Sequence, residues 1–158
     1  MTDHADGIVV GVDGSEASVA ALRWAAGQAR TLGTPVVAVH AWQPSTAGLA
    51  PYAPASGRPT VAEERLRAAG LLASAVAEAI GPHTGADVRA VVAEGPPARV
   101  LLQHARGALL LALGRTPHDQ GVVPAVGSVS RACLRHATVP VVTVPAPERT
   151  TAGHALAR

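Results

Sequence analysis

The sequence contains no lysine, no phenylalanine and a single cysteine, Cys133. The absence of lysine excludes a P-loop lysine, a Schiff-base lysine and any lysine contact to a phosphate. A single cysteine excludes an internal disulfide, which fits a reducing cytoplasm. Because aromatic residues make up only 2% of the chain, the core has to be built from Ala, Val and Leu. The chain also offers no platform of aromatic rings for stacking nucleic-acid bases.

Charge and hydropathy point away from nucleic acids and membranes as partners. The thirteen basic residues are all arginines, and eleven acidic residues leave a net charge of +2. The arginines are scattered along the sequence, which gives little support to nucleic-acid binding. No apolar run approaches the ~18–20 residues that a membrane span requires, and the polar start of the chain does not resemble a secretory signal. We therefore expect a cytoplasmic protein.

Five short apolar segments alternate with helical patterns. Strands are predicted at residues 7–12, 36–41, 87–92, 108–113 and 139–144. Most are continuous and rich in β-branched residues, as in strands buried on both faces of a parallel sheet. The third alternates and the fifth closes the series, so both are expected at edges. The predicted fold is α/β: one Rossmann-like, open, five-stranded parallel sheet with helices on both faces.

The helical segments carry apolar residues at helical spacing. The first is predicted from Glu16 to Leu32, with Ser15 as N-cap and Gly33 as C-terminal residue. Each of the other three helices is expected to bury one stripe of residues. The stripes are Ala62, Leu66, Ala69, Ala73, Val76 and Ile80 in the second helix; Ala98, Leu101, Leu102 and Ala105 in the third; and Val129, Ala132, Cys133 and His136 in the fourth. Residues 43–60 are predicted to form a long loop.

Polar and glycine residues follow the first and fourth strands, where open parallel sheets bind ligands. Asp13 follows the first strand, and its carboxylate could accept hydrogen bonds from a ribose; alternatively, it organises the turn into the helix. Gly114 follows the fourth, where a glycine lets a ligand approach the backbone. Gly127 and Ser128 open a helix whose free N–H groups favour an anion, or else provide a simple turn and N-cap.

The stretch from Ala108 to Val144 resembles the C-terminal signature of the universal stress protein family, G-x2-G-x9-G-[ST] in its ATP-binding members. Gly114, Gly127 and Ser128 match that spacing. The segments 11–15, 37–41 and 94–98 resemble the family's first strand, second strand and entry to the third helix. The resemblance therefore covers nearly the whole chain, with residues 1–146 as the domain and 147–158 as a flexible tail.

The resemblance implies a regulatory protein of the stress response that binds ATP, with Mg²⁺, and no dedicated enzyme. The residues carried over to the nucleotide site are Val12, Asp13, Ala41, Gly114, Gly127, Ser128, Val129 and Ser130. It also implies a homodimer through the strand Val139–Val144. No structural metal is expected, because the histidines lack metal-site spacing.

One position departs from the signature: Pro117 replaces its second glycine. Proline has no N–H, so a backbone hydrogen bond to phosphate is lost. Such a bond is worth ~1.5–3 kcal/mol, which corresponds to roughly 10- to 100-fold in affinity. Arg115 and Arg131 would offset part of this loss if they faced the phosphates. The alternative function is an interaction module of the stress response that has lost ATP binding through Pro117.

Several other residues have a structural explanation. Cys133 is predicted to be a buried thiol, and His40 and His136 to be packing or capping groups. Trp24 and Trp42 are predicted to anchor the edges of a core of small residues. An ATP-consuming enzyme is disfavoured, because H-x-G-H, S-G-G-x-D-S and G-x-G-x-x-G are all absent.

Overall fold

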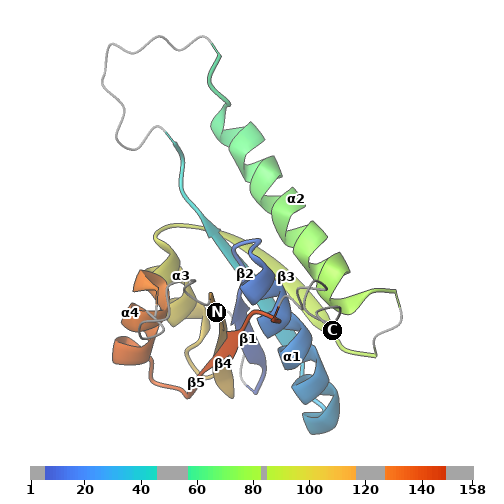
Figure 1. The fold of residues 1–158 in the computed structure, drawn as a ribbon. Helices are drawn as coiled ribbons and strands as arrows, with labels where there is room; N and C mark the ends of the chain where they lie inside the picture. The colour runs from blue at the N-terminus through green and yellow to red at the C-terminus, as the bar shows by residue number, and fades with distance from the viewer. Residues whose placement is uncertain (1–5, 46–56, 83–84, 117–126, 149–158) are drawn as a thin grey trace, which may run out of the picture.

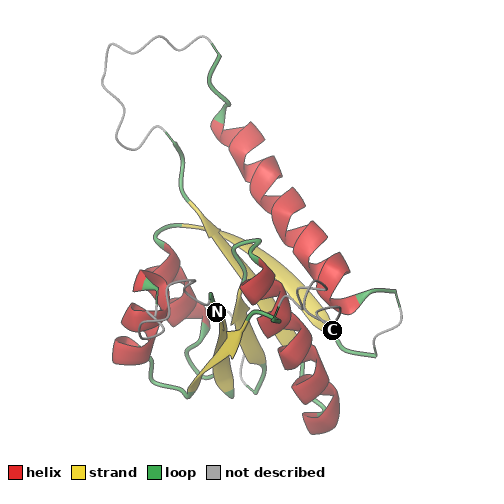
Figure 2. Ribbon diagram, in the orientation of Figure 1, coloured by secondary structure: helices red, strands yellow, loops and turns green. Residues whose placement is uncertain are grey.

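The computed structural model describes residues 6–45, 57–82, 85–116 and 127–148. Strands and helices alternate along the chain (Figures 1 and 2). They are β1 (Ile8–Gly11), α1 (Glu16–Leu32), β2 (Val36–Trp42), α2 (Val61–Ile80), β3 (Val88–Glu94), α3 (Pro97–His104), β4 (Leu110–Arg115), α4 (Ser128–His136) and β5 (Val141–Pro145).

The strands form one sheet in the order β3-β2-β1-β4-β5, and every neighbouring pair is parallel. In the register, Val9 of β1 lies between Val37 of β2 and Leu111 of β4. The predicted fold class is confirmed, and so are the edge positions of β3 and β5. The order reverses between β1 and β4, because the chain runs outward from β1 to β3 and then returns to the other side of β1.

The helices cover both faces of the sheet (Figure 1). Alternate residues of β1 point to opposite faces, so Val10 belongs to one core cluster and Val9 to the other. The first cluster includes Ala25 of α1 and Leu72 of α2. The second includes residues of α3 together with Cys133 of α4. As expected, each core consists mainly of Ala, Val and Leu.

The predicted bounds of the first helix are confirmed at both ends. The Ser15 hydroxyl accepts a hydrogen bond from the backbone N–H of Ser18 at 3.2 Å. Gly33 ends the helix in the left-handed region, with a φ of 68°, a conformation that glycine adopts without a steric penalty. Trp24, half-buried, packs against the first core cluster as predicted.

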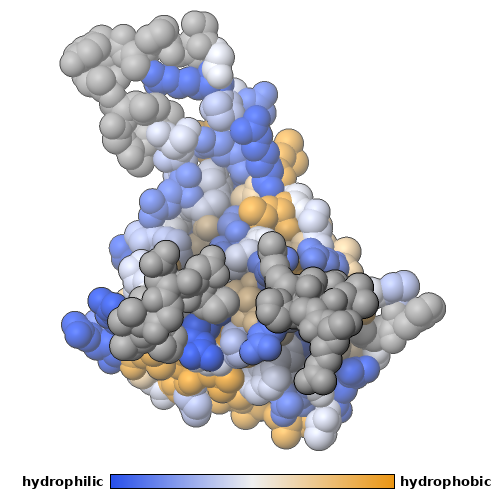
Figure 3. All heavy atoms as spheres, in the orientation of Figure 1, coloured by the Kyte–Doolittle hydropathy of each residue, from blue (hydrophilic) through white to orange (hydrophobic). Residues whose placement is uncertain are grey.

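The predicted buried stripe of the second helix is largely wrong. Val76 and Ile80 do pack against the core, but Ala62, Leu66, Ala69 and Ala73 are exposed. The buried residues are instead Ala68, Leu72, Ala75 and Ala79. The many alanines of α2 give several stripes with equal spacing. In addition, the first turns of α2 project beyond the sheet, where hydrophilic residues dominate (Figures 1 and 3) and Leu66 is 72% exposed.

Three further predictions need correction. The fifth strand is Val141–Pro145, so Val139 and Pro140 of the predicted range lie before it. The fourth strand begins at Leu110 and ends at Arg115, two residues later than predicted. Ala108 is buried, but its N–H bonds to Ala105 in the turn after α3, so its burial reflects turn packing. In α4, His136 is exposed rather than buried, whereas Cys133 is fully buried as predicted.

Candidate functional site

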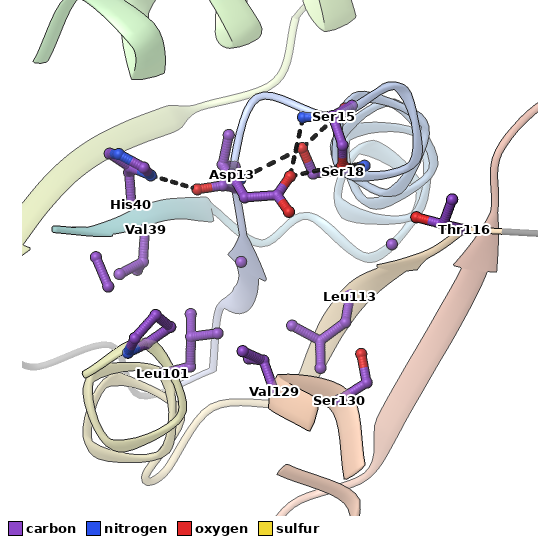
Figure 4. Close-up of a pocket in the computed structure, with 15 residues that line it drawn as sticks. Asp13, Ser15, Ser18, Val39, His40, Leu101, Leu113, Thr116, Val129 and Ser130 are labelled. Carbon is purple, nitrogen blue, oxygen red and sulfur yellow. Dashed lines mark hydrogen bonds between the residues drawn. The ribbon is translucent and has the colours of Figure 1, made fainter. Parts of the chain in front are cut away.

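A pocket of about 240 Å³ lies at the carboxyl ends of β1, β2 and β4, where the strand order reverses (Figure 4). This is where open parallel sheets bind their ligands. It is lined by Gly11, Val12, Asp13, Ser15, Ser18, Val39, His40, Ala41, Pro97, Leu101, Leu113, Gly114, Thr116, Val129 and Ser130. Six of the eight residues predicted from the sequence are therefore brought together here, and Gly127 and Ser128 are not among the lining residues.

Asp13 organises the turn into α1, which confirms the structural alternative for this residue. Its Oδ1 accepts hydrogen bonds from the Ser15 backbone N–H at 2.9 Å and from the Ser15 hydroxyl at 2.6 Å. Within the described residues, Oδ2 has no hydrogen-bond partner. The exposed carboxyl group therefore performs the structural role with one oxygen and keeps the other available to a ligand hydroxyl.

The surroundings of Asp13 also favour its ionised form. Partial burial raises the pKa of this carboxyl group, but the hydrogen bonds from Ser15, together with the nearby Ser18 hydroxyl, stabilise the anion and outweigh that effect. The resulting pKa lies below the ordinary value for aspartate. At neutral pH the group is a carboxylate that only accepts hydrogen bonds.

His40 holds the end of β1 in place. Its Nδ1 lies 2.7 Å from the carbonyl oxygen of Val12 (Figure 4), while the Val12 N–H donates to the carbonyl of Val39 at 2.8 Å. Both polar groups of the Val12 backbone are thus bonded to β2. The predicted capping role of His40 is confirmed, and Ala41 lies beside it in the pocket wall.

Gly114 lines the pocket, and packing gives a reason for its lack of a side chain that the sequence did not predict. A Cβ atom at this position would lie 2.4 Å from the carbonyl carbon of Ala17 and 2.5 Å from the backbone nitrogen of Ser18. Real Cβ atoms do not approach backbone so closely. Glycine is therefore required for α1 to pack against β4, and this packing brings the start of α1 to the pocket.

The start of α4 forms another wall of the pocket. Val129 and Ser130 line it, whereas Gly127 and Ser128 are exposed. The predicted serine cap is wrong: Gly127 is the N-cap, and no side chain caps the helix. Helix geometry leaves the first N–H groups of α4 without intrahelical partners, and the helix dipole makes this end attractive to an anion.

Sequence reasoning missed nine lining residues. The sequence predicts Ser15 only as a helix cap. Its position two residues after Asp13 could also have predicted that it lines the pocket. The apolar walls Val39, Leu101 and Leu113 were expected only as core. Neither Arg115 nor Arg131 lines the pocket. The pocket lining therefore does not support the idea that these arginines compensate for the phosphate hydrogen bond lost at Pro117. Pro117 and the rest of the segment 117–126 lie outside the described residues.

Cys133 has the properties of a structural thiol. Cys133 is 0% exposed, and burial raises the pKa of its thiol. No cluster of three or more His, Cys, Asp or Glu side chains able to hold a metal ion occurs among the described residues. The described helices include none with the length and apolarity needed to cross a lipid bilayer.

Comparison with known proteins identifies the family. The model of the universal stress protein family matches residues 5–145. The chain belongs to the universal stress protein family. A universal stress protein of Mycolicibacterium smegmatis is 31% identical over 142 residues, a match that covers 87% of this chain and 47% of the relative. The chain thus spans about half the length of that relative.

Solved universal stress proteins share the fold. A family member from Burkholderia pseudomallei is 26% identical, with a TM-score of 0.66, and the match covers 91% of this chain and 98% of that one. A universal stress protein from Archaeoglobus fulgidus, solved in complex with dAMP, is 24% identical with a TM-score of 0.64; 89% and 98% of the two chains are covered. These likenesses confirm the Rossmann-like architecture.

Proposed function

We propose that this universal stress protein is a regulatory adenine-nucleotide-binding protein, with ATP and Mg²⁺ as its ligand. The observation that carries the proposal is the pocket at the β1–β4 switch point, with an ionised Asp13 beside an uncapped helix start. The Archaeoglobus relative with dAMP offers a precedent within the fold. The proposed site residues are Val12, Asp13, Ala41, Gly114, Gly127, Ser128, Val129 and Ser130.

The pocket lining suits the base and the ribose of a nucleotide. Val39, Leu101 and Val129 provide apolar walls for a base, and the free oxygen of Asp13 suits a ribose hydroxyl. The pocket volume of about 240 Å³ lies just below the ~300–1,000 Å³ typical of sites for small molecules. The nucleoside would therefore occupy the pocket, and the phosphates would extend toward the exposed start of α4.

Magnesium would be held mainly by the nucleotide. Mg²⁺ in such sites takes one or two carboxylates, with phosphate and water oxygens completing its shell. Asp13 is the one carboxylate among the lining residues, and its free oxygen is assigned to the ribose, so phosphate and water oxygens would supply the shell of the ion. When bound, the ion would neutralise part of the phosphate charge in a chain that has no lysine.

The test is a calorimetric titration of the dialysed protein with Mg-ATP, at two temperatures because a binding enthalpy can vanish at one. Saturable binding in or below the high-micromolar range is expected. Asp13→Ala should weaken it, while Asp87→Ala, an exposed aspartate at the amino end of β3, should leave it unchanged. No binding by the wild-type protein at either temperature would refute the proposal.

The alternative is a stress-response module that works without nucleotide, and Pro117 is the residue that favours it. If the missing backbone N–H has abolished binding, Pro117→Gly should create ATP affinity where the wild-type protein has none. If the wild-type protein already binds and Pro117→Gly changes nothing, the alternative fails. In either case we propose a regulatory, cytoplasmic protein and no dedicated enzyme, in which slow hydrolysis would be incidental to binding.

We further propose that residues 1–146 form the domain and that it dimerises through the predicted strand Val139–Val144. Within the described residues β5 pairs with β4 alone, so its outer edge presents unpaired backbone groups that favour pairing with a second chain. The side chains of Val141–Val144 are only partly buried. Light scattering at high protein concentration should give the mass of a dimer, and a monomer would contradict the proposal.

A further inference from the structure

The layer formed by α3 and α4 carries its arginines on the outside. Arg99 and Arg106 lie seven residues apart on the exposed side of α3 and the turn that follows it, and Arg131 and Arg135 lie one turn apart on α4. The two helices pack beside each other on one face of the sheet. We call these four exposed residues the basic face.

Few acidic residues balance this charge nearby in the sequence, where Glu94 and Glu148 are the described ones that flank the two segments. The described segments 95–116 and 127–147 contain no Asp or Glu. The ion pair found within the described residues joins Arg89 to Asp87, and none involves the basic face. In contrast, α1 and α2 on the other face of the sheet carry four glutamates and four arginines. The charge asymmetry thus belongs to one layer, although the arginines look scattered in the sequence.

The stability of the helices explains only part of the basic face. Arg135 lies in the last turn of α4, where the helix dipole favours a positive charge. Arg131 and Arg135 are four residues apart on one helix, where like charges repel and destabilise the helix. Leu134, between them, is 50% exposed. Arginine is enriched in protein–protein interfaces, from which lysine is depleted, and Leu134 adds an exposed apolar side chain to the same helix.

We infer that the basic face docks an acidic segment of another protein, with carboxylates pairing with the arginines and an apolar side chain packing on Leu134. A nucleic acid is disfavoured because the layer has no aromatic residue for base stacking and the net charge of the chain is only +2. A membrane surface is disfavoured because the outer sides of α3 and α4 lack the broad apolar stripe of interfacial helices. The inference does not depend on nucleotide binding.

The test uses a short fluorescent peptide of Glu-Glu-Leu repeats, with Gln-Gln-Leu repeats as the uncharged control, in fluorescence polarisation at low salt. The wild-type protein should bind the first peptide and not the second. Arg131→Glu with Arg135→Glu should weaken binding about tenfold, since two attractive charge pairs become repulsive. Arg99→Glu with Arg106→Glu provides an independent pair if the α4 variant fails to fold.

The matched control is Arg65→Glu with Arg67→Glu, two exposed arginines of α2 in the opposite layer. This variant has the same change in net charge and should bind the acidic peptide like the wild-type protein. Equal losses in both double variants would overturn the inference, because only net charge would then matter. It would also be overturned by no binding of the acidic peptide, or by tighter binding to duplex DNA or to phosphatidylserine vesicles.

Discussion

Gly114 of β4 and Ala17 of α1 are in backbone contact: a Cβ added to the glycine would lie 2.4 Å from the Ala17 carbonyl carbon. The start of α1 is therefore seated directly on the strand that ends at the pocket. This contact joins β4 to the start of α1, the two segments at the reversal of strand order. It therefore helps to position Asp13 and Ser18 at the pocket.

Replacing Gly114 by alanine should destabilise the protein by about 3 kcal/mol, because the methyl group meets backbone that has no rotamer to escape into. Urea denaturation followed by circular dichroism measures the loss. Gly27→Ala in α1 is the control: a Cβ there meets nothing within 4 Å, and alanine in a helix should stabilise by up to about 1 kcal/mol. A Gly114→Ala protein as stable as the wild type would contradict the observed packing.

The lowered pKa of Asp13 predicts how stability depends on pH. Because the folded state holds this carboxyl group below its ordinary pKa of 3.8, the unfolded chain binds its proton more readily. The resulting stabilisation is present above that pKa and is lost as the pH falls through the lower folded value. The free energy of unfolding should therefore fall less between pH 6 and pH 3 (roughly the window of aspartate titration) in Asp13→Asn than in the wild-type protein. If the free energy of unfolding depended on pH equally in both proteins, the hydrogen bonds to the Asp13 carboxylate would not stabilise the folded state as proposed.

Ser15 both caps α1 and bonds to Asp13. Ser15→Ala should cost about 1 kcal/mol of stability, the usual cost of losing a serine N-cap, and should also weaken ATP binding by releasing the Asp13 side chain. Thermal unfolding and titration with Mg-ATP measure the two effects. Ser74→Ala, on the exposed side of α2, should leave ATP binding unchanged and should not destabilise the protein, since alanine is the better helix former. A Ser15→Ala protein with unchanged stability would argue against the cap.

Cys133 should be inert in the folded protein, since it is fully buried and burial raises the pKa of its thiol. A chromogenic disulfide reagent should react with it only after unfolding in urea. The control carries Cys133→Ala and Leu134→Cys, which moves the thiol to a side chain that is 50% exposed and should react at once. Rapid reaction of the native wild-type protein would show that the α4 layer opens.

The sequence predicted α1 and failed on α2 for reasons that lie in the residues themselves. Ser15 and Gly33 define the ends of α1 through local hydrogen bonds and backbone conformation, which are properties of neighbouring residues. The face that α2 buries is chosen by the sheet beneath it. Its run of small residues allows more than one choice, and Ala68 and Leu72 are selected over Ala69 and Ala73 only by tertiary contact.

The candidate site was predictable in its polar parts and not in its walls. Asp13 and Ser130 were placed by motif, and both line the pocket. Leu101 and Leu113 have the pattern of ordinary core residues. The sequence does not show where the helices stop covering the sheet, and it is at that point that core side chains become pocket walls. The role of Gly114 in packing was likewise hidden, since the residue it accommodates, Ala17, is almost a hundred positions away in the chain and meets it only through the crossover.

The bond between His40 and Val12 has a consequence for how the site keeps its shape. A carbonyl oxygen can only accept, so Nδ1 of His40 carries the hydrogen that bridges the 2.7 Å. The Val12 N–H is bonded to Val39 as well, so both backbone groups of the residue before Asp13 are held by β2. The strand next to β1, rather than the turn alone, therefore sets where the Asp13 carboxylate stands.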